Sequence, residues 1–288
     1  MKLRRLFLLL VLSGALLAAD KPPIAKKPTT KGEDKTAIPA EKGVPRTELK
    51  AQVMPGASLK FDFPELTVDR HGAMAACNLT LPQNYEAEKK YPLVVWLGGG
   101  EGGNSPSGAF LPAGDFITVG LPYPKGANNP AQANMVGEFP KIWTYHRFML
   151  DEIAKVIPNI DKKKSIVAGF SNGGHSIDGM LRARAPGAPI TDYFGIFIFA
   201  DGGGTPYTSK GSLPNLTGKF AYACWGSEKG SNKPATSQLP KELKAKGATS
   251  LGSEMAGVGH AFADTEHPKV AAWLEKVALA GLATPAKK

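Results

Sequence analysis

The sequence predicts an α/β fold in which a mostly parallel central sheet is flanked by helices on both faces. Short apolar runs rich in β-branched residues end in glycine-containing loops, which is typical of buried parallel strands. An amphipathic helical pattern separates two of these runs, as in a β-α-β unit. Residues 169–173, Gly-Phe-Ser-Asn-Gly, then place a serine between glycines where a strand is expected to turn into a helix.

The first half of the body supplies the edge of the sheet and its first parallel strands. Residues 59–63 and 73–81 are expected to form an antiparallel pair at that edge. Residues 91–97 and 116–122 are apolar runs that stop at glycine or proline, so each is predicted to be a buried strand. Between residues 139 and 157 apolar side chains recur at helical spacing, which predicts a crossover helix that ends before a proline.

The second half continues the alternation of strands and helices. Further strands are expected over residues 165–170, 193–200, 220–225 and 250–255. Helices are expected from Ser171 to about residue 184, over residues 237–246 and over residues 268–279. Ser237 is a suitable N-cap for the second of these helices, and Pro240 is tolerable in its first turn.

The two ends of the chain differ from the body in composition. Residues 1–19 combine a basic start, a short leucine-rich run and a small-residue exit, which predicts a signal peptide and a secreted or periplasmic protein; an uncleaved anchor is the alternative. Residues 20–50 are rich in Lys and Pro and lack aromatics, so we expect a disordered tether. Residues 51–282 then form one domain, followed by a basic tail over 283–288, and no later apolar run suits a membrane span.

The net charge of +10 belongs mostly to these ends, which leaves about +2 for the body. No basic patch with interleaved aromatic residues occurs within the body. We therefore expect no nucleic-acid partner.

Ser171 is the candidate nucleophile. The glycines on either side relieve the crowding of a tight strand-to-helix turn, which would lift the serine hydroxyl above the edge of the sheet. A serine hydroxyl is a weak nucleophile at neutral pH, so it needs a general base within hydrogen-bond reach and a carboxylate to orient that base.

His260 is the preferred base, because it lies in a glycine loop between the last strand and the last helix. His175 lies about one helical turn after Ser171, where its ring is expected to pack or to brace the turn. His146 falls on the apolar face of the crossover helix, which favours a buried structural histidine.

The orienting carboxylate has several candidates. Glu228 is the first choice, because it follows the strand at 220–225 and gives the chain order serine, acid, histidine. Asp201 is its rival; it follows the preceding strand and opens a run of three glycines. Asp264 lies close to His260 in sequence but suits a helix cap better.

A serine nucleophile also needs two preorganised N–H donors for the oxyanion that forms when it attacks a carbonyl group. The backbone N–H of Asn172, at the start of the helix, is one candidate. Gly99 or Gly100 would supply the other, because a residue without a side chain lets the backbone approach the substrate. The alternative of a phosphate-binding loop is disfavoured, because residues 98–103 lack the Lys-Ser/Thr ending and no helix follows directly.

Several segments together resemble the secreted esterases of the α/β-hydrolase superfamily. They are residues 81–85, residues 90–95 with the glycine loop after them, residues 159–161 and residues 167–175. The nearest groups are those similar to polyhydroxybutyrate depolymerases and to feruloyl or acetyl-xylan esterases. The resemblance implies that Ser171 is the nucleophile and His260 the base. The chain departs from these groups at Gly98, where they often have histidine, and at Lys229, where they usually have aspartate.

These observations predict an exported serine esterase that acts on a small-molecule or polymer-linked ester. No organic cofactor is expected, and no metal, since the sequence has no Cys/His cluster with metal-ligand spacing. One alternative is a catalytically degraded hydrolase fold that serves as a binding or scaffold protein of the cell envelope. Another is a peptidase or acyltransferase with the same serine, because loops decide the leaving group and the acceptor.

Overall fold

The computed structural model describes residues 46–126, 128–129, 134–204 and 211–283. The expected signal peptide, the expected tether up to residue 45 and residues 284–288 of the expected tail lie outside the described residues.

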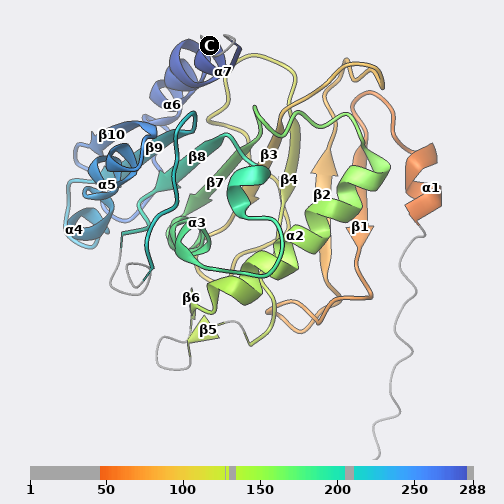
Figure 1. Ribbon diagram of the computed structural model, residues 1–288, viewed down its shortest axis with the longest axis horizontal. Helices are drawn as coiled ribbons and strands as arrows, with labels where there is room; N and C mark the ends of the chain where they lie inside the picture. Colours follow the sequence, from red (N-terminus) through yellow and green to blue (C-terminus); the bar gives the residue numbers. More distant parts are fainter. Residues whose placement is uncertain (1–45, 127, 130–133, 205–210, 284–288) are drawn as a thin grey trace, which may run out of the picture. The chain divides into compact units, whose positions relative to one another are not determined.

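The central layer is an eight-stranded sheet in the order β1-β2-β4-β3-β7-β8-β9-β10 (Figure 1). Its strands are β1 Ser58–Asp62, β2 Ala76–Thr80, β3 Leu93–Leu97, β4 Ile117–Gly120, β7 Ile166–Phe170, β8 Ile196–Ala200, β9 Phe220–Gly226 and β10 Thr249–Met255. β2 pairs antiparallel with β1 and β4, and all the other pairs are parallel. The sequence-based prediction of a mostly parallel sheet with an antiparallel edge is therefore confirmed. The short strands β5 Asn128–Asn129 and β6 Asn134–Gly137 pair with each other in a separate ribbon.

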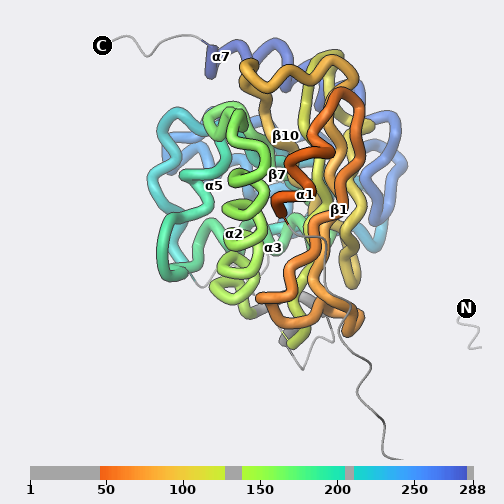
Figure 2. Tube along the Cα trace, turned by 90° about the vertical axis from the view of Figure 1, so that its right-hand side faces the viewer, coloured from red at the N-terminus to blue at the C-terminus, as the bar shows by residue number. Residues whose placement is uncertain are grey.

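Helices cover both faces of this sheet, because its strands are apolar on both sides. The helices are α1 Arg46–Ala51, α2 Phe139–Val156, α3 Asn172–Arg182, α4 Lys233–Thr236, α5 Leu239–Ala245, α6 His267–Trp273 and α7 Ala280–Ala283, with a π-helical segment Leu274–Leu279 between the last two. One buried apolar cluster joins α1, α2, α3 and α5 to the sheet, and a second joins α6, the π-helical segment and α7 to it. Figure 2 shows α2 and α3 on one side of the strands and part of the C-terminal segment on the other.

A short helix lies at the predicted boundary between the tether and the domain. α1 covers residues 46–51 and buries Leu49. Arg46 pairs with Glu65 at 3.0 Å and with Glu152 at 2.7 Å, which ties the helix to the body. Residues 46–50, which were expected to belong to the tether, therefore lie in a helix that packs against α2.

The segment between β9 and β10 also differs from the prediction of one helix over residues 237–246. It forms the two short helices α4 and α5, and Ser237 ends the first instead of capping the second. Pro240 does lie in the first turn of α5, where its missing N–H has no helical partner to lose.

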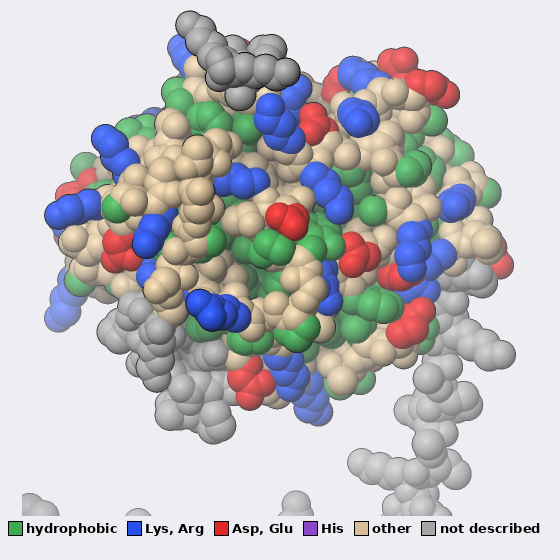
Figure 3. All heavy atoms as spheres, in the orientation of Figure 1, with side chains coloured by type: hydrophobic (Ala, Val, Ile, Leu, Met, Phe, Trp, Pro, Cys, Tyr) green, Lys and Arg blue, Asp and Glu red, His purple; other side chains and the backbone are tan. Residues whose placement is uncertain are grey.

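The surface over α2 and α3 carries charges of both signs. In Figure 3, basic and acidic side chains are interspersed over this face, and no field of a single sign forms on it. Within the described ranges, no helix combines the length and the apolar character needed to cross a membrane.

Candidate active site

Ser171 forms a sharp turn between β7 and α3. Its φ of 53° lies in the left-handed region that serine rarely adopts, and its N–H donates to Ala200 O at 2.9 Å. The turn requires glycine at position 173. A Cβ there would lie 2.1 Å from Leu97 O, which is inside contact distance. The strained turn predicted at Ser171 is thus present.

A continuous line of hydrogen bonds joins Ser171, His260 and Asp201. Ser171 Oγ lies 2.8 Å from His260 Nε2, and His260 Nδ1 lies 2.5 Å from Asp201 Oδ2. A carboxylate only accepts, so Nδ1–H donates to Asp201 and leaves Nε2 to accept from the serine hydroxyl. His260, which lies 89 positions after Ser171 and 59 after Asp201, is therefore within hydrogen-bond distance of both.

Of the two carboxylates preferred from the sequence, the structure places Asp201, and not Glu228, against His260. Glu228 is exposed, and its carboxylate accepts from Ser227 Oγ at 3.2 Å. Asp201, the rival candidate, has no exposed surface and occupies the position against His260. The physical reason is strand order: β8 is bonded directly beside β7, with Ala200 opposite Phe170, so the residue after β8 emerges next to Ser171.

Asn232 holds Asp201 from the far side of the site. Its backbone N–H donates to Asp201 Oδ1 at 3.0 Å, and its side-chain Nδ2 donates to Asp201 O at 2.7 Å. Sequence reasoning missed this residue, because an asparagine in a polar loop between β9 and α4 carries no signal that it contacts a carboxylate 31 positions away.

Two side chains of α3 hold the turn that follows Asp201. His175 Nδ1 accepts from the N–H of Gly203 at 2.7 Å, and Asp178 Oδ2 accepts from the N–H of Gly204 at 2.8 Å. Both side chains are buried. The ring of His175 was expected to pack or to brace the turn at Ser171; its side-chain hydrogen bond instead braces the turn after β8.

The predicted oxyanion donors lie around Ser171. A Cβ at Gly99 would lie 3.2 Å from the Cβ of Ser171, so the glycine loop passes directly over the serine. Asn172 Nδ2 donates to Gly100 O at 3.0 Å and fixes the loop to the start of α3. The backbone N–H groups of Gly99, Gly100 and Asn172 donate to no acceptor in the part of the chain that is described.

Comparison with known proteins finds similarity only at the level of solved structures. No protein-family model and no curated protein match the sequence. An esterase from Pyrobaculum calidifontis has a TM-score of 0.52 and 14% identity, over 82% of this chain and 88% of its own. Thermogutta terrifontis esterase 2 phosphoramylated by tabun has a TM-score of 0.52 and 11% identity, over 82% and 98%.

A third solved structure, from Bacteroides ovatus and described as a putative dipeptidyl aminopeptidase IV, has a TM-score of 0.50 and 12% identity over 76% of this chain. The match spans only 36% of that longer protein. The matches cover 76–82% of this chain, whose sheet is mixed and mostly parallel. The chain has the α/β-hydrolase fold.

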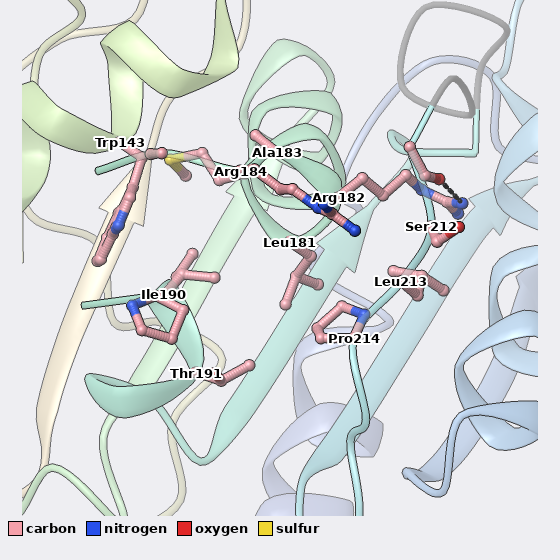
Figure 4. A pocket seen from close by; sticks show the side chains of 14 residues that line it. Trp143, Leu181, Arg182, Ala183, Arg184, Ile190, Thr191, Ser212, Leu213 and Pro214 are labelled. Carbon is pink, nitrogen blue, oxygen red and sulfur yellow. Dashed lines mark hydrogen bonds between the residues drawn. The ribbon is translucent and has the colours of Figure 1, made fainter. Parts of the chain in front are cut away.

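In this α/β-hydrolase fold, a large cavity among the described residues lies away from Ser171. A cavity of about 700 Å³ is lined by Trp143, Leu181, Arg184 and Leu213 among others, at the C-terminal end of α3 (Figure 4). Ser171 precedes the other end of that helix, roughly 15 Å away at 1.5 Å per residue. Among the described residues, no group of three or more metal-ligating side chains gathers.

The buried side chains of His146 and His175 should make the stability of the fold sensitive to acid. Burial lowers the pKa of each from 6.5 to about 4. The unfolded chain therefore takes up these protons near pH 6.5, whereas the folded chain resists them until about pH 4, so stability is lost as pH falls between these values. Between pH 7 and pH 5 we expect each histidine to lower the free energy of unfolding by roughly 2 kcal/mol.

Urea denaturation at pH 7 and pH 5 measures this effect. Most carboxylates titrate below pH 5, so they contribute little to the difference in stability between these two pH values. His146→Gln is the matched variant, because the amide nitrogen can still donate to Pro122 O in place of Nε2 without titrating. It should lose about half of the pH dependence. Equal unfolding midpoints for the wild type at the two pH values would contradict the prediction.

Proposed function

We propose that this chain is a serine hydrolase that cleaves carboxylic esters through an acyl-enzyme on Ser171. The observation that carries the proposal is the unbroken hydrogen-bonded line from Ser171 Oγ through His260 to the buried carboxylate of Asp201. Buried carboxylate, imidazole and strained serine in this order are the groups that acyl transfer requires.

In the proposed reaction, Ser171 Oγ attacks the ester carbonyl carbon and its proton passes to His260 Nε2. Asp201 stabilises the imidazolium that forms and keeps the ring oriented. The N–H groups of Asn172 and of Gly99 or Gly100 receive the negative oxygen. Collapse of the intermediate expels the alcohol, which takes the proton from His260. Water, activated by the same imidazole, then releases the acid and restores Ser171.

Two of the three structural neighbours reported above are esterases, which supports the choice of ester over amide bonds. The aminopeptidase among them keeps amide hydrolysis as the outcome to test against. The proposal includes export, supported by the basic start and apolar run of residues 1–19. N-terminal sequencing of protein recovered from the periplasm or medium tests that part, and an intact Met1 would contradict it.

A fluorophosphonate probe tests the function without knowledge of the substrate. Attack by Ser171 Oγ on phosphorus would expel fluoride and leave a phosphonyl group on the oxygen, which peptide mass spectrometry locates. We expect a single label on Ser171, together with hydrolysis of short-chain aryl esters faster than of the matching anilides. Absence of the label from Ser171 would overturn the enzyme proposal, and faster anilide cleavage would overturn the ester proposal alone.

A further inference from the structure

The turn after β8 places the carboxylate of Asp201 by an unusual backbone path. Asp201 has a φ of 44°, and Gly203 and Gly204 follow with φ of 89° and 68°. Residues other than glycine uncommonly adopt a positive φ, although aspartate tolerates it better than most. The turn therefore needs contacts that hold it, because a relaxed Asp201 would move its carboxylate away from His260.

The helix that begins after Ser171 supplies these contacts. His175 and Asp178 are three residues apart, so they lie on the same face of α3, and they accept from the successive N–H groups of Gly203 and Gly204 at 2.7 and 2.8 Å. Gly202 lies between Asp201 and these glycines, and a Cβ there would be 2.2 Å from Ser171 O. The turn is thus pressed against the start of α3 and bonded to its first two turns.

Each acceptor is suited to its task. Burial lowers the pKa of His175 to about 4, so its ring is neutral at neutral pH and Nδ1 has a lone pair for the N–H of Gly203. Asp178 is fully buried, and its other oxygen accepts from Arg182 Nε at 2.8 Å. Arg182 also pairs with Glu242 on α5. Asp178 is therefore fixed in place before it meets the turn.

We propose that His175 and Asp178 are positioning residues that hold Asp201 against His260, so that α3 sets the geometry of the nucleophile and of the acid together. Neither side chain is placed at the reacting atoms; both act through the backbone of residues 203 and 204. The inference rests on the proposed serine-hydrolase function, because it assigns a role within that site.

The experiment compares the rate at which a fluorophosphonate labels Ser171 in the full chain. His175→Leu introduces an apolar side chain of similar size, which fills the space but removes the acceptor for the N–H of Gly203. His175→Asn restores it, because asparagine Oδ1 takes the place of Nδ1. A misplaced acid weakens activation of the serine, so we expect His175→Leu to slow labelling by about 10- to 100-fold and His175→Asn to stay within about threefold of the wild type.

A double-mutant cycle separates positioning from general destabilisation. If His175 acts through Asp201, then His175→Leu in an Asp201→Ala background should slow labelling no further. With an aryl ester, the single variant should lower kcat and leave KM unchanged. Asp178→Asn provides a second, independent variant. The carboxylate accepts from both Arg182 and Gly204, whereas the amide has only one oxygen and can accept from only one of them.

Tyr85→Phe is the matched control for loss of one buried hydrogen bond. Tyr85 Oη donates to Asn159 Oδ1 at 2.8 Å in a buried hydrogen bond outside the site, and we expect its variant to melt at a lower temperature but label Ser171 at the wild-type rate. Full labelling of a folded His175→Leu, or an additive loss in the Asp201→Ala background, would overturn the inference. An unlabelled wild type would instead overturn the proposed function. If His175→Leu does not fold, Asp178→Asn decides the outcome: labelling slower than in the wild type supports the inference, and labelling at the wild-type rate overturns it.

Discussion

Replacing Ser171 with alanine should abolish hydrolysis and probe labelling. The substitution removes the only atom that the proposed mechanism allows to attack, while the backbone turn and its N–H donors stay. We expect kcat on an aryl ester to fall by an amount on the order of 10⁶-fold, to the level left by binding and oxyanion stabilisation. The measurement is a burst and steady-state assay at high enzyme concentration.

The control for this variant is Ser237→Ala, which removes another half-buried serine hydroxyl outside the site. It should retain wild-type kcat and full labelling. The assignment of Ser171 as the nucleophile fails if purified Ser171→Ala retains more than a small fraction of the wild-type activity.

Replacing Asp201 with asparagine should have the second largest effect. The amide has the shape of the carboxylate, but its Nδ2–H₂ or oxygen offers no charge to His260, so the ring loses the partner that fixes its tautomer. We expect kcat to fall by about 10⁴-fold with little change in KM. Glu228→Gln should change kcat by less than about twofold, because that carboxylate is exposed and contacts Ser227.

The two variants together decide which carboxylate acts. Equal and small losses in both would mean that neither orients the base, and a larger loss in Glu228→Gln would reverse the assignment drawn from the geometry. Far-UV circular dichroism checks that Asp201→Asn, which alters a buried residue, remains folded.

The order of strands and helices was accessible from the sequence because the apolar runs are short and are bounded by glycine or proline. Strands at 93–97 and 166–170 fall inside the ranges expected for them. α1 was missed for a physical reason: six residues with one buried leucine carry no periodic signal, and the helix is stabilised by Arg46 reaching Glu65 and Glu152 from elsewhere in the chain.

The candidate site was accessible to the extent that local motifs place it. Ser171 and His260 each lie in a glycine-rich context that announces a sharp turn or a loop. The acid was ambiguous because strand order is a tertiary property: whether residue 201 or 228 meets His260 depends on β8, not β9, lying beside β7. The side chains of Asn232, His175 and Asp178 bond to backbone atoms of residues 201, 203 and 204, and a partner of this kind leaves no mark on the sequence pattern.

The crowding at Gly173 and Gly202 has a consequence for how such a chain diverges. At both positions a carbonyl oxygen occupies the place that a side chain would need, Leu97 O at 2.1 Å and Ser171 O at 2.2 Å. No substitution can be accommodated there by repacking neighbours, because the obstacle is the main chain itself. Random mutagenesis should recover many surface changes and almost none at these two glycines.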